Sequence, residues 1–305
     1  MKIMKRYIQV IFICWLSINS ITEVYGKDPI GISLVKWSFR TQTAILCDMA
    51  KENGAVAIDM VDPEKWDIVK EKGLTVAMAD GIDMGIERGF CDRRWHSSLI
   101  ENYKRFIPLL AEKGIKQVVC YSGINTDLSD EEALEACVEG LKPLLDIAEK
   151  ANVTLVMELL SSRNTEEIFT KQRFSYYQCD NPEWGVALCK KLNSPNFKLL
   201  YDVWHMNDIG RDIFLNHKTV QKLMKQLGLV CCVRIKKYHS YISHYHIAGI
   251  PERKGLNRTD SFNYQQFMKL LKKVGYQGYV GLEPDRIEKN LKSTIQESIT
   301  LLKNK

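Results

Sequence analysis

The chain has 305 residues, of which 45% are apolar, and this is enough to bury one large core as a single domain. Its formal charge of +6 at pH 7 is too mild to argue for or against nucleic-acid binding. The nine cysteines are scattered without framework spacing and include no CxxC pair, so the chain has neither a disulfide scaffold pattern nor a cysteine-based zinc pattern. We expect most of them to be small buried hydrophobic residues.

Residues 1–26 have the features of an export signal: a basic start, an apolar stretch from Tyr7 to Ile18, and a small residue at Gly26. The apolar stretch is too short to cross a bilayer, which needs about 20 residues. We therefore expect residues 1–26 to be a cleaved signal peptide rather than a retained anchor. Residues 27–305 would then be periplasmic or extracellular, without stable membrane insertion.

Strand-like apolar runs alternate with longer amphipathic segments through residues 27–305, as a parallel sheet with crossover helices requires. The expected strands are, in chain order, Ile32–Lys36, Val56–Met60, Leu74–Ala79, Lys116–Tyr121, Val153–Glu158, Lys198–Asp202, Ile242–Ala248 and Tyr279–Leu282. The clearest helices are Asp130–Lys150, Phe262–Val274 and Glu288–Leu302. No linker or low-complexity tract divides this region. The pattern predicts a single-domain α/β protein, a (β/α)8 TIM barrel.

Four of the expected strands end on a side chain that can bind a metal. These side chains, about 40 residues apart, are Glu158, Asp202, His246 and Glu283. That separation matches one strand, one helix and their loops, so all four would gather at the same end of successive parallel strands. The spacing therefore predicts a metal at the mouth of the barrel.

Each of these carboxylates also has an ordinary structural interpretation. Glu158 lies in an apolar strand, so it must be paired, coordinated to a metal or at the solvent end, and a structural ion pair is the simplest case. Asp202 and Glu283, taken alone, fit a helix or loop cap as well as a ligand. The repetition of the arrangement over consecutive units favours the metal.

Two histidines, His244 and His246, share one face of their strand because side chains alternate with a period of two. One of them would touch the metal, and the other would orient it or hydrogen-bond in the core. His205 follows Asp202 by three residues, which suits contact with a substrate better than direct metal binding. Arg253 lies in the loop after the seventh strand and could reach a substrate oxygen, or be solvated. The other histidines are expected to be bystanders: His96, His217 and His239.

The chain resembles the xylose-isomerase-like TIM barrels, and within them the hydroxypyruvate isomerase type, from about Ile32 to its end. The segments that carry this resemblance include Val153–Leu160, Lys198–Met206, His244–Gly249, Pro251–Arg253 and Gly275–Pro284. The resemblance implies one divalent metal, Mn²⁺ or Mg²⁺ with Co²⁺ as an alternative, because three carboxylates and one imidazole form a hard donor set. The implied metal ligands are Glu158, Asp202, His246 and Glu283, and the implied substrate-binding residues are His205 and Arg253.

The chemistry implied by the resemblance is proton abstraction next to a carbonyl. The metal would stabilise an enediolate, while Glu158 and Glu283 act as the catalytic acid/base pair. Use of one face of the substrate would give aldose–ketose isomerisation, as in a hydroxypyruvate isomerase, and use of both faces would give a ketose 3-epimerase. The sequence leaves both open, with a small sugar or hydroxy-carbonyl compound as the substrate.

Several departures from the family pattern limit this transfer. Hydroxypyruvate isomerases usually have Gln at the position of His246, whereas the ketose 3-epimerase branch has His. The family's Pro-Gly-Arg turn has Glu252 as its middle residue here, and Glu252 could pair with Arg253. A location outside the cytoplasm also fits carbohydrate processing better than central hydroxypyruvate metabolism.

Two functions from other classes compete with the isomerase. A non-catalytic sugar-binding barrel would keep the metal site while its substrate loops diverge. Metal-dependent endonucleases of the same superfamily use a histidine-rich cluster of several metals, and the six histidines of this chain argue against that function and against nucleic acid as a partner. Whether the chain forms a homo-oligomer is left open.

Overall fold

The computed structural model describes residues 29–81, 84–162, 176–207 and 229–303, and for residues 229–233 it describes the backbone only. The expected signal peptide, residues 1–26, and the expected bystander His217 lie outside these ranges. None of the helices in the described ranges is long and apolar enough to cross a membrane.

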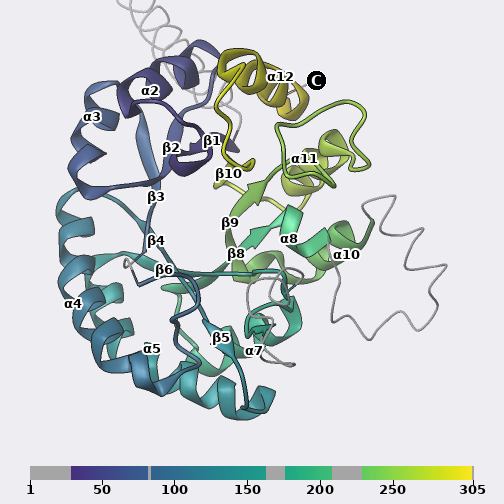
Figure 1. Cartoon of the computed structure of the whole chain (residues 1–305). Coiled ribbons are helices and arrows are strands. Elements are labelled where there is room, and N and C mark those ends of the chain that lie inside the picture. The colour runs from purple at the N-terminus through teal and green to yellow at the C-terminus, as the bar shows by residue number, and fades with distance from the viewer. Residues whose placement is uncertain (1–28, 82–83, 163–175, 208–228, 304–305) are drawn as a thin grey trace, which may run out of the picture.

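The described residues form a closed parallel barrel in the order β1-β10-β9-β8-β6-β4-β3-β2 (Figure 1). Its strands are β1 (Gly31–Val35), β2 (Ala57–Val61), β3 (Thr75–Ala79), β4 (Gln117–Cys120), β6 (Thr154–Glu158), β8 (Phe197–Asp202), β9 (Ile242–Ile247) and β10 (Tyr279–Leu282). All the expected strands are present with small shifts at their ends, so the (β/α)8 TIM barrel is confirmed. A separate antiparallel pair of two short strands, β5 (Ile124–Asn125) and β7 (Tyr176–Tyr177), was not expected.

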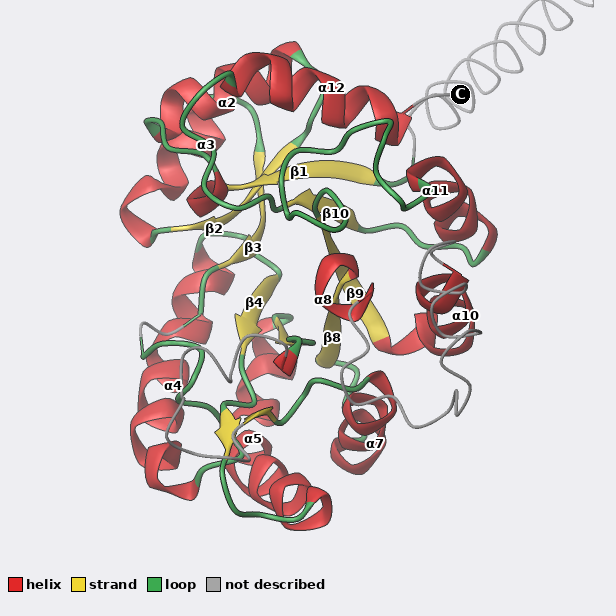
Figure 2. Cartoon of the chain, turned by 45° about the vertical axis from the view of Figure 1, so that its right-hand side comes forward, coloured by secondary structure: helices red, strands yellow, loops and turns green. Residues whose placement is uncertain are grey.

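Helices surround the strands on the outside of the barrel (Figure 2). In the described ranges they are α2 (Thr43–Glu52), α3 (Trp66–Glu71), α4 (His96–Glu112), α5 (Asp130–Ala151), α7 (Pro182–Leu192), α8 (Val203–Asn207), α10 (Leu229–Tyr238), α11 (Tyr264–Lys273) and α12 (Leu291–Lys303). Short 3-10 turns are η1 (Lys36–Ser38), η2 (Pro63–Lys65), η3 (Arg93–Trp95) and η5 (His239–Tyr241).

The three expected helices are present, and two of them begin later than expected. The α5 helix starts as expected, because the Ser129 hydroxyl and the Glu132 carboxylate form a capping box. The α11 helix begins at Tyr264, since the side chain of Asn263 accepts a hydrogen bond from the Gln266 N–H and so caps the helix. The expected start of α12 was wrong by three residues, because Asn290 has a left-handed backbone with a φ of 55° and the helix begins after it.

The core has an outer layer between strands and helices and a small inner layer that fills the barrel. The inner layer consists of Val35, Met60, Met78, Val119, Val156 and Leu200. Two residues after Val156 and Leu200, the strand period brings Glu158 and Asp202 to the same inner face, at the carboxyl ends of β6 and β8. The cysteines whose side chains are described are buried and free, as expected: Cys47, Cys91, Cys120, Cys137, Cys179 and Cys189.

Candidate metal centre

The four side chains expected to bind a metal converge at the carboxyl ends of their strands. Glu158, Asp202, His246 and Glu283 are all buried, and each offers one ligand atom within 4.8 Å of the others. Asp202 on β8 is directly opposite His246 on β9 in the strand register. The expected convergence is therefore present, and the ligand roles themselves stay a prediction.

Asp202 can serve both as a helix cap and as a metal ligand, the two interpretations that the sequence left open. Its Oδ1 accepts hydrogen bonds from the backbone N–H groups of Trp204 at 2.7 Å and His205 at 3.1 Å, at the start of α8. Its Oδ2 is buried without a hydrogen bond in the described part of the chain. One oxygen therefore caps the short helix, and the other is left for the site.

The three carboxylates of the centre lie too close together for all of them to be ionised at neutral pH without a cation. Burial and the neighbouring Glu283 raise the pKa of Asp202 to about 7, and the same two causes raise the pKa of Glu158 well above its ordinary value. Burial also acts to raise the pKa of Glu283, but His246 and Arg253 outweigh it and lower that pKa. The electrostatics thus favour a positive ion between these groups.

The donor set passes a test for a bound divalent cation. Both ring nitrogens of His246, like Oδ2 of Asp202, are buried without an aligned hydrogen-bond partner among the described residues. Buried polar atoms are rarely left in this state unless a water or an ion satisfies them. Glu158 has no ion pair with any described residue, which removes support for the structural ion-pair interpretation. Three carboxylates and one imidazole suit Mn²⁺, Mg²⁺ or Co²⁺.

The centre opens into a cavity of about 490 Å³, and Glu158 and Glu283 both line it. Its wall also contains residues that the sequence did not indicate: Trp37, Met60, Ile86, Tyr121, Leu160, Ser161, Tyr177, Trp204 and Arg286. A larger cavity of about 910 Å³ shares Trp37, Met60, Ile86 and Tyr121 with it. Some of these residues directly follow a strand, as Trp37 and Tyr121 do, and that position was the available signal.

His205 lies where a substrate-contacting residue is expected, since it lines the cavity beside Glu158. Its Nδ1 accepts a hydrogen bond from the Ser161 N–H at 3.2 Å, so Nε2 carries the proton. Burial and the nearby Arg253 lower the pKa of His205 to about 3. The imidazole is therefore neutral at pH 7 and can donate a hydrogen bond from Nε2.

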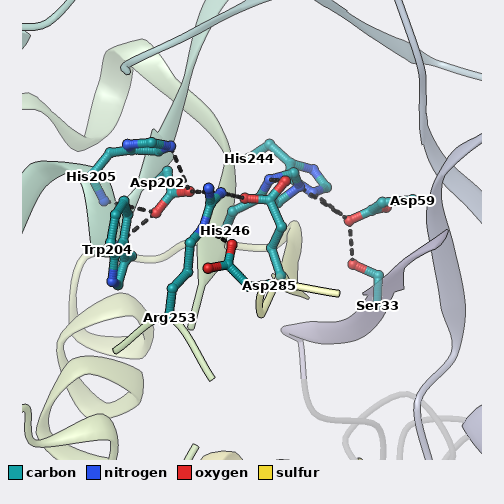
Figure 3. A network of polar contacts seen from close by, with 10 residues as sticks. Ser33, Asp59, Asp202, Trp204, His205, His244, His246, Arg253 and Asp285 are labelled. Atoms are coloured by element: carbon teal, nitrogen blue, oxygen red, sulfur yellow. Dashed lines mark hydrogen bonds and ion pairs between the residues drawn. The ribbon is translucent and has the colours of Figure 1, made fainter. Parts of the chain in front are cut away.

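Arg253 also lies in the site, but its guanidinium is held by protein groups. Nη2 is 2.7 Å from Oε2 of Glu283. The same atom is 3.5 Å from Oδ2 of Asp202 (Figure 3). The guanidinium carbon lies 4.9 Å from the ring of Trp204 and 5.5 Å from that of Trp37, close enough for cation–π interactions. Arg253 thus orients Glu283 at the cavity wall.

The structure also answers the expectations for Glu252 and for two of the bystander histidines. Glu252 does not pair with Arg253; it contacts Lys254 at the surface. His96 and His239 are outside the site: Nε2 of His96 is 2.9 Å from the Phe90 carbonyl, and His239 lies in the exposed turn η5.

A second buried polar group, which we call the Asp59 cluster, consists of Ser33, Asp59 and His244. Oδ2 of Asp59 accepts hydrogen bonds from Oγ of Ser33 at 2.6 Å and Nε2 of His244 at 2.9 Å. The sequence indicated a core role for His244 as one alternative, and this role is confirmed. Asp59 was missed, although a single aspartate inside the apolar run of β2 was a visible signal.

Comparisons with known proteins agree with this fold. A putative hydroxypyruvate isomerase of Xenopus laevis is 27% identical over 161 residues, or 53% of this chain and 49% of the relative. A 2-oxo-tetronate isomerase of Cupriavidus necator is 23% identical over 146 residues, or 48% of this chain and 45% of the relative. The chain thus spans about half the length of the curated relatives that it matches.

Solved structures with low sequence identity share the fold. A family 2 AP endonuclease from Brucella melitensis has a TM-score of 0.67 at 18% identity, covering 88% of this chain and 97% of that chain. D-psicose 3-epimerase with D-tagatose from Clostridium cellulolyticum H10 gives 0.63 at 16%, covering 88% and 90%. An IolI protein with a bound zinc atom gives 0.63 at 15%, covering 90% and 95%.

A family model described as xylose isomerase-like TIM barrel matches residues 48–305, the region that contains all four converging side chains. The chain therefore belongs to the xylose isomerase-like TIM barrel family.

Proposed function

We propose that the protein is a metal-dependent isomerase or epimerase of a small hydroxy-carbonyl compound or sugar, acting through an enediolate. The observation that carries this proposal is the set of four ligand-bearing side chains within 4.8 Å of one another, at a cavity that Glu158 and Glu283 both line. Names of relatives support the same class, since they include a hydroxypyruvate isomerase, a 2-oxo-tetronate isomerase and a ketose 3-epimerase.

The metal would be one divalent ion, Mn²⁺ or Mg²⁺ with Co²⁺ as an alternative, held by Glu158, Asp202, His246 and Glu283. When bound, it would polarise the carbonyl and the adjacent hydroxyl of the substrate. This would lower the free energy of the enediolate, whose negative charge otherwise sets the barrier.

The protein side chains would move the proton. Glu158 lines the cavity, and its carboxylate would remove the proton next to the substrate carbonyl. Glu283 is oriented by Nη2 of Arg253 and would return the proton. The neutral His205 would donate from Nε2 to a substrate oxygen, and Arg253 would add positive charge beside it.

Two reactions are compatible with this proposal. A hydroxypyruvate isomerase-like reaction would return the proton to the neighbouring carbon on the same face, and a ketose 3-epimerase would return it to the same carbon on the opposite face. The histidine at position 246 favours the epimerase. The aromatic side chains of Trp37, Tyr121, Tyr177 and Trp204 in the cavity wall suit a sugar, because aromatic rings pack against its C–H faces. We also propose export after cleavage of residues 1–26, which fits carbohydrate processing.

A single experiment tests the proposed chemistry. Metal-free protein is reloaded with Mg²⁺, confirmed to hold it by elemental analysis, and incubated in deuterated water with a panel of ketoses, aldoses and hydroxypyruvate. NMR should detect deuterium entering at the carbon next to the carbonyl. If no candidate exchanges although the metal is bound, the non-catalytic sugar-binding barrel becomes the better description.

A further inference from the structure

We infer that Asp59 is a positioning residue of the metal centre, which holds the imidazole of His246 from the side opposite Glu283. This inference rests on the proposed metal-dependent function. It assigns a role to a side chain on β2, a strand that contributes none of the four proposed ligands.

The two nitrogens of His246 face two different carboxylates. Nδ1 is 3.2 Å from Oε1 of Glu283, within the proposed metal set, and Nε2 is 3.5 Å from Oδ2 of Asp59. An imidazole that binds a metal through one nitrogen keeps a proton on the other, and a carboxylate acceptor for that proton fixes the ring and strengthens the ligand. Oδ2 of Asp59, 3.5 Å from Nε2 and not in an aligned hydrogen bond with it, is placed to become this acceptor when the metal binds at Nδ1.

Asp59 is itself held in place. Its Oδ2 receives the Ser33 hydroxyl at 2.6 Å and Nε2 of His244 at 2.9 Å (Figure 3). The side chains of Asp59, His244 and His246 are fully buried. A carboxylate this deep in a barrel is retained only when donors surround it. Ser33 and His244 meet this need at Oδ2 and fix the direction in which Asp59 presents that oxygen, whereas Oδ1 has no hydrogen bond among the described residues.

The backbone of β2 is shaped to aim Asp59 inward. The register between β2 and β3 shifts on both sides of Asp59, and Met60 has a φ of 49°. A non-glycine residue in this left-handed region is uncommon, and β-bulges of this kind redirect side chains near functional sites. As a result, Ile58 and Val61, three residues apart, both pack in the outer core. Asp59 and Met60 both point into the barrel.

A glycine leaves the space through which Asp59 reaches His246. The strands β10 and β1 stand between β9 and β2, and Gly281 of β10 is in register with His246 on one side and Ser33 on the other. A Cβ at position 281 would lie 2.5 Å from Oδ2 of Asp59 and 2.7 Å from Cδ2 of His246. Only a residue without a side chain allows the contact.

The same residues could be mistaken for a second metal site. Asp59, His244 and His246 offer atoms within 4.8 Å of one another. Direct hydrogen bonds from Ser33 and His244 already occupy Oδ2 of Asp59, which favours a hydrogen-bonded support over a second ion. Oδ1 of Asp59 and Nδ1 of His244 are buried without a hydrogen bond among the described residues. The number of metals bound per chain separates the two explanations.

The test compares Asp59→Asn with the wild-type protein and with Asp146→Asn, which changes an exposed aspartate of α5. Calorimetric titration with Mn²⁺ should show a dissociation constant raised about 10- to 100-fold in Asp59→Asn and unchanged in Asp146→Asn. Elemental analysis should give one metal per chain in every protein. The visible absorption of Co²⁺-loaded Asp59→Asn should also shift, because the imidazole ligand is reoriented.

A purely structural role for Asp59 would lower the unfolding temperature of the metal-free protein and leave the Mn²⁺ dissociation constant of the folded fraction unchanged. That result would overturn the inference. Two metals in the wild type and one in Asp59→Asn would also overturn it, in favour of a second metal site. If Asp59→Asn does not fold, Ser33→Ala keeps the carboxylate and loses one of its donors, and it should raise the dissociation constant by a smaller factor. A wild type that binds no Mn²⁺ rejects the proposed function itself, whereas equal affinities reject only the role of Asp59.

Discussion

Two buried polar groups meet at His246, and they satisfy their charges in different ways. In the proposed metal set, the carboxylates of Glu158, Asp202 and Glu283 face one another, and Oδ2 of Asp202 has no hydrogen bond within the described residues. In the Asp59 cluster, one carboxylate oxygen meets two protein donors.

This difference indicates which part of the barrel depends on an added ion. The proposed ligands come from β6, β8, β9 and β10, and the support comes from β1, β2 and β9. The proposed metal set thus leaves Oδ2 of Asp202 without a donor among the described residues, whereas Oδ2 of Asp59 has two protein donors. A hydrogen-bonded aspartate beside a highly charged ligand set would hold one imidazole in place.

The largest effect, on the rate of proton exchange, should come from removing the proposed base of the metal set, Glu158. Glu158→Gln keeps the volume of the side chain and loses the carboxylate, so exchange of the substrate α-proton with solvent should fall about 10²- to 10⁴-fold. NMR in deuterated water measures the rate, and circular dichroism checks that the fold is intact. Glu297→Gln, on the exposed side of α12, serves as the control. An unchanged exchange rate in Glu158→Gln would exclude Glu158 as the base.

Metal binding should depend on pH because protons compete for the same atoms. Burial and Glu283 raise the pKa of Asp202 to about 7, so in the metal-free protein this group is protonated below pH 7 and ionised above it. A carboxyl whose folded pKa is raised stabilises the fold at low pH, and this contribution is lost as the pH rises through 7. The metal-free protein should therefore lose stability from pH 6 to pH 8, while the affinity for Mn²⁺ rises roughly tenfold per pH unit for each proton released.

Thermal unfolding with EDTA or Mn²⁺ measures this effect. At an Mn²⁺ concentration about 100 times the dissociation constant, the stabilisation should be about 2.7 kcal/mol, and it should require more Mn²⁺ at pH 6 than at pH 8. An equal requirement at both pH values would contradict the assignment of buried carboxylates as ligands.

A smaller effect on Mn²⁺ affinity should show whether the contact between Asp59 and His246 matters beyond ordinary packing. Gly281→Ala places a methyl group against Asp59 and His246, and Gly140→Ala places one 2.8 Å from Nε2 of His96 and Cδ1 of Phe90, away from the site. Both substitutions should cost about 1–3 kcal/mol of unfolding free energy through overpacking. Only Gly281→Ala should also weaken Mn²⁺ binding in calorimetry. Equal affinities in the two variants would mean that the space at position 281 does not matter for the metal.

The smallest effect should come from an ion pair outside both groups. Arg40 and Glu288 lie 3.0 Å apart, and both side chains are 56% exposed. Water and salt screen such a pair, so Arg40→Ala should change the unfolding free energy by less than about 0.5 kcal/mol. Urea denaturation measures this value, and a change above about 1 kcal/mol would show that exposure is a poor guide to the contribution of charges in this protein.

The sequence predicted the barrel and the convergence of four side chains because both follow from local periodicity. A strand period of two places Glu158 and Asp202 on the inner face beyond Val156 and Leu200, whichever helices lie outside. What it missed depends on contacts distant in sequence. Asp59 and His244 are 185 residues apart, and nothing near Asp59 in the sequence indicates its partner.

Backbone irregularities were also beyond prediction from the sequence. The bulge at Met60 places a residue of unremarkable type in the left-handed region, and no glycine or asparagine marks it. Similarly, backbone hydrogen bonds join Ile287, just before α12, to Ser38 and Arg40 in the segment after β1. These features arise from packing between neighbouring βα units rather than from the propensity of any one segment.

The space at Gly281 also has a consequence for the divergence of this family. Because a side chain at position 281 would occupy the place where Asp59 meets His246, these three positions cannot vary independently. A homologue with glutamine in place of the histidine has no imidazole to support, and it is free to lose both the aspartate and the glycine. Aligned sequences should therefore show positions 59, 246 and 281 changing together.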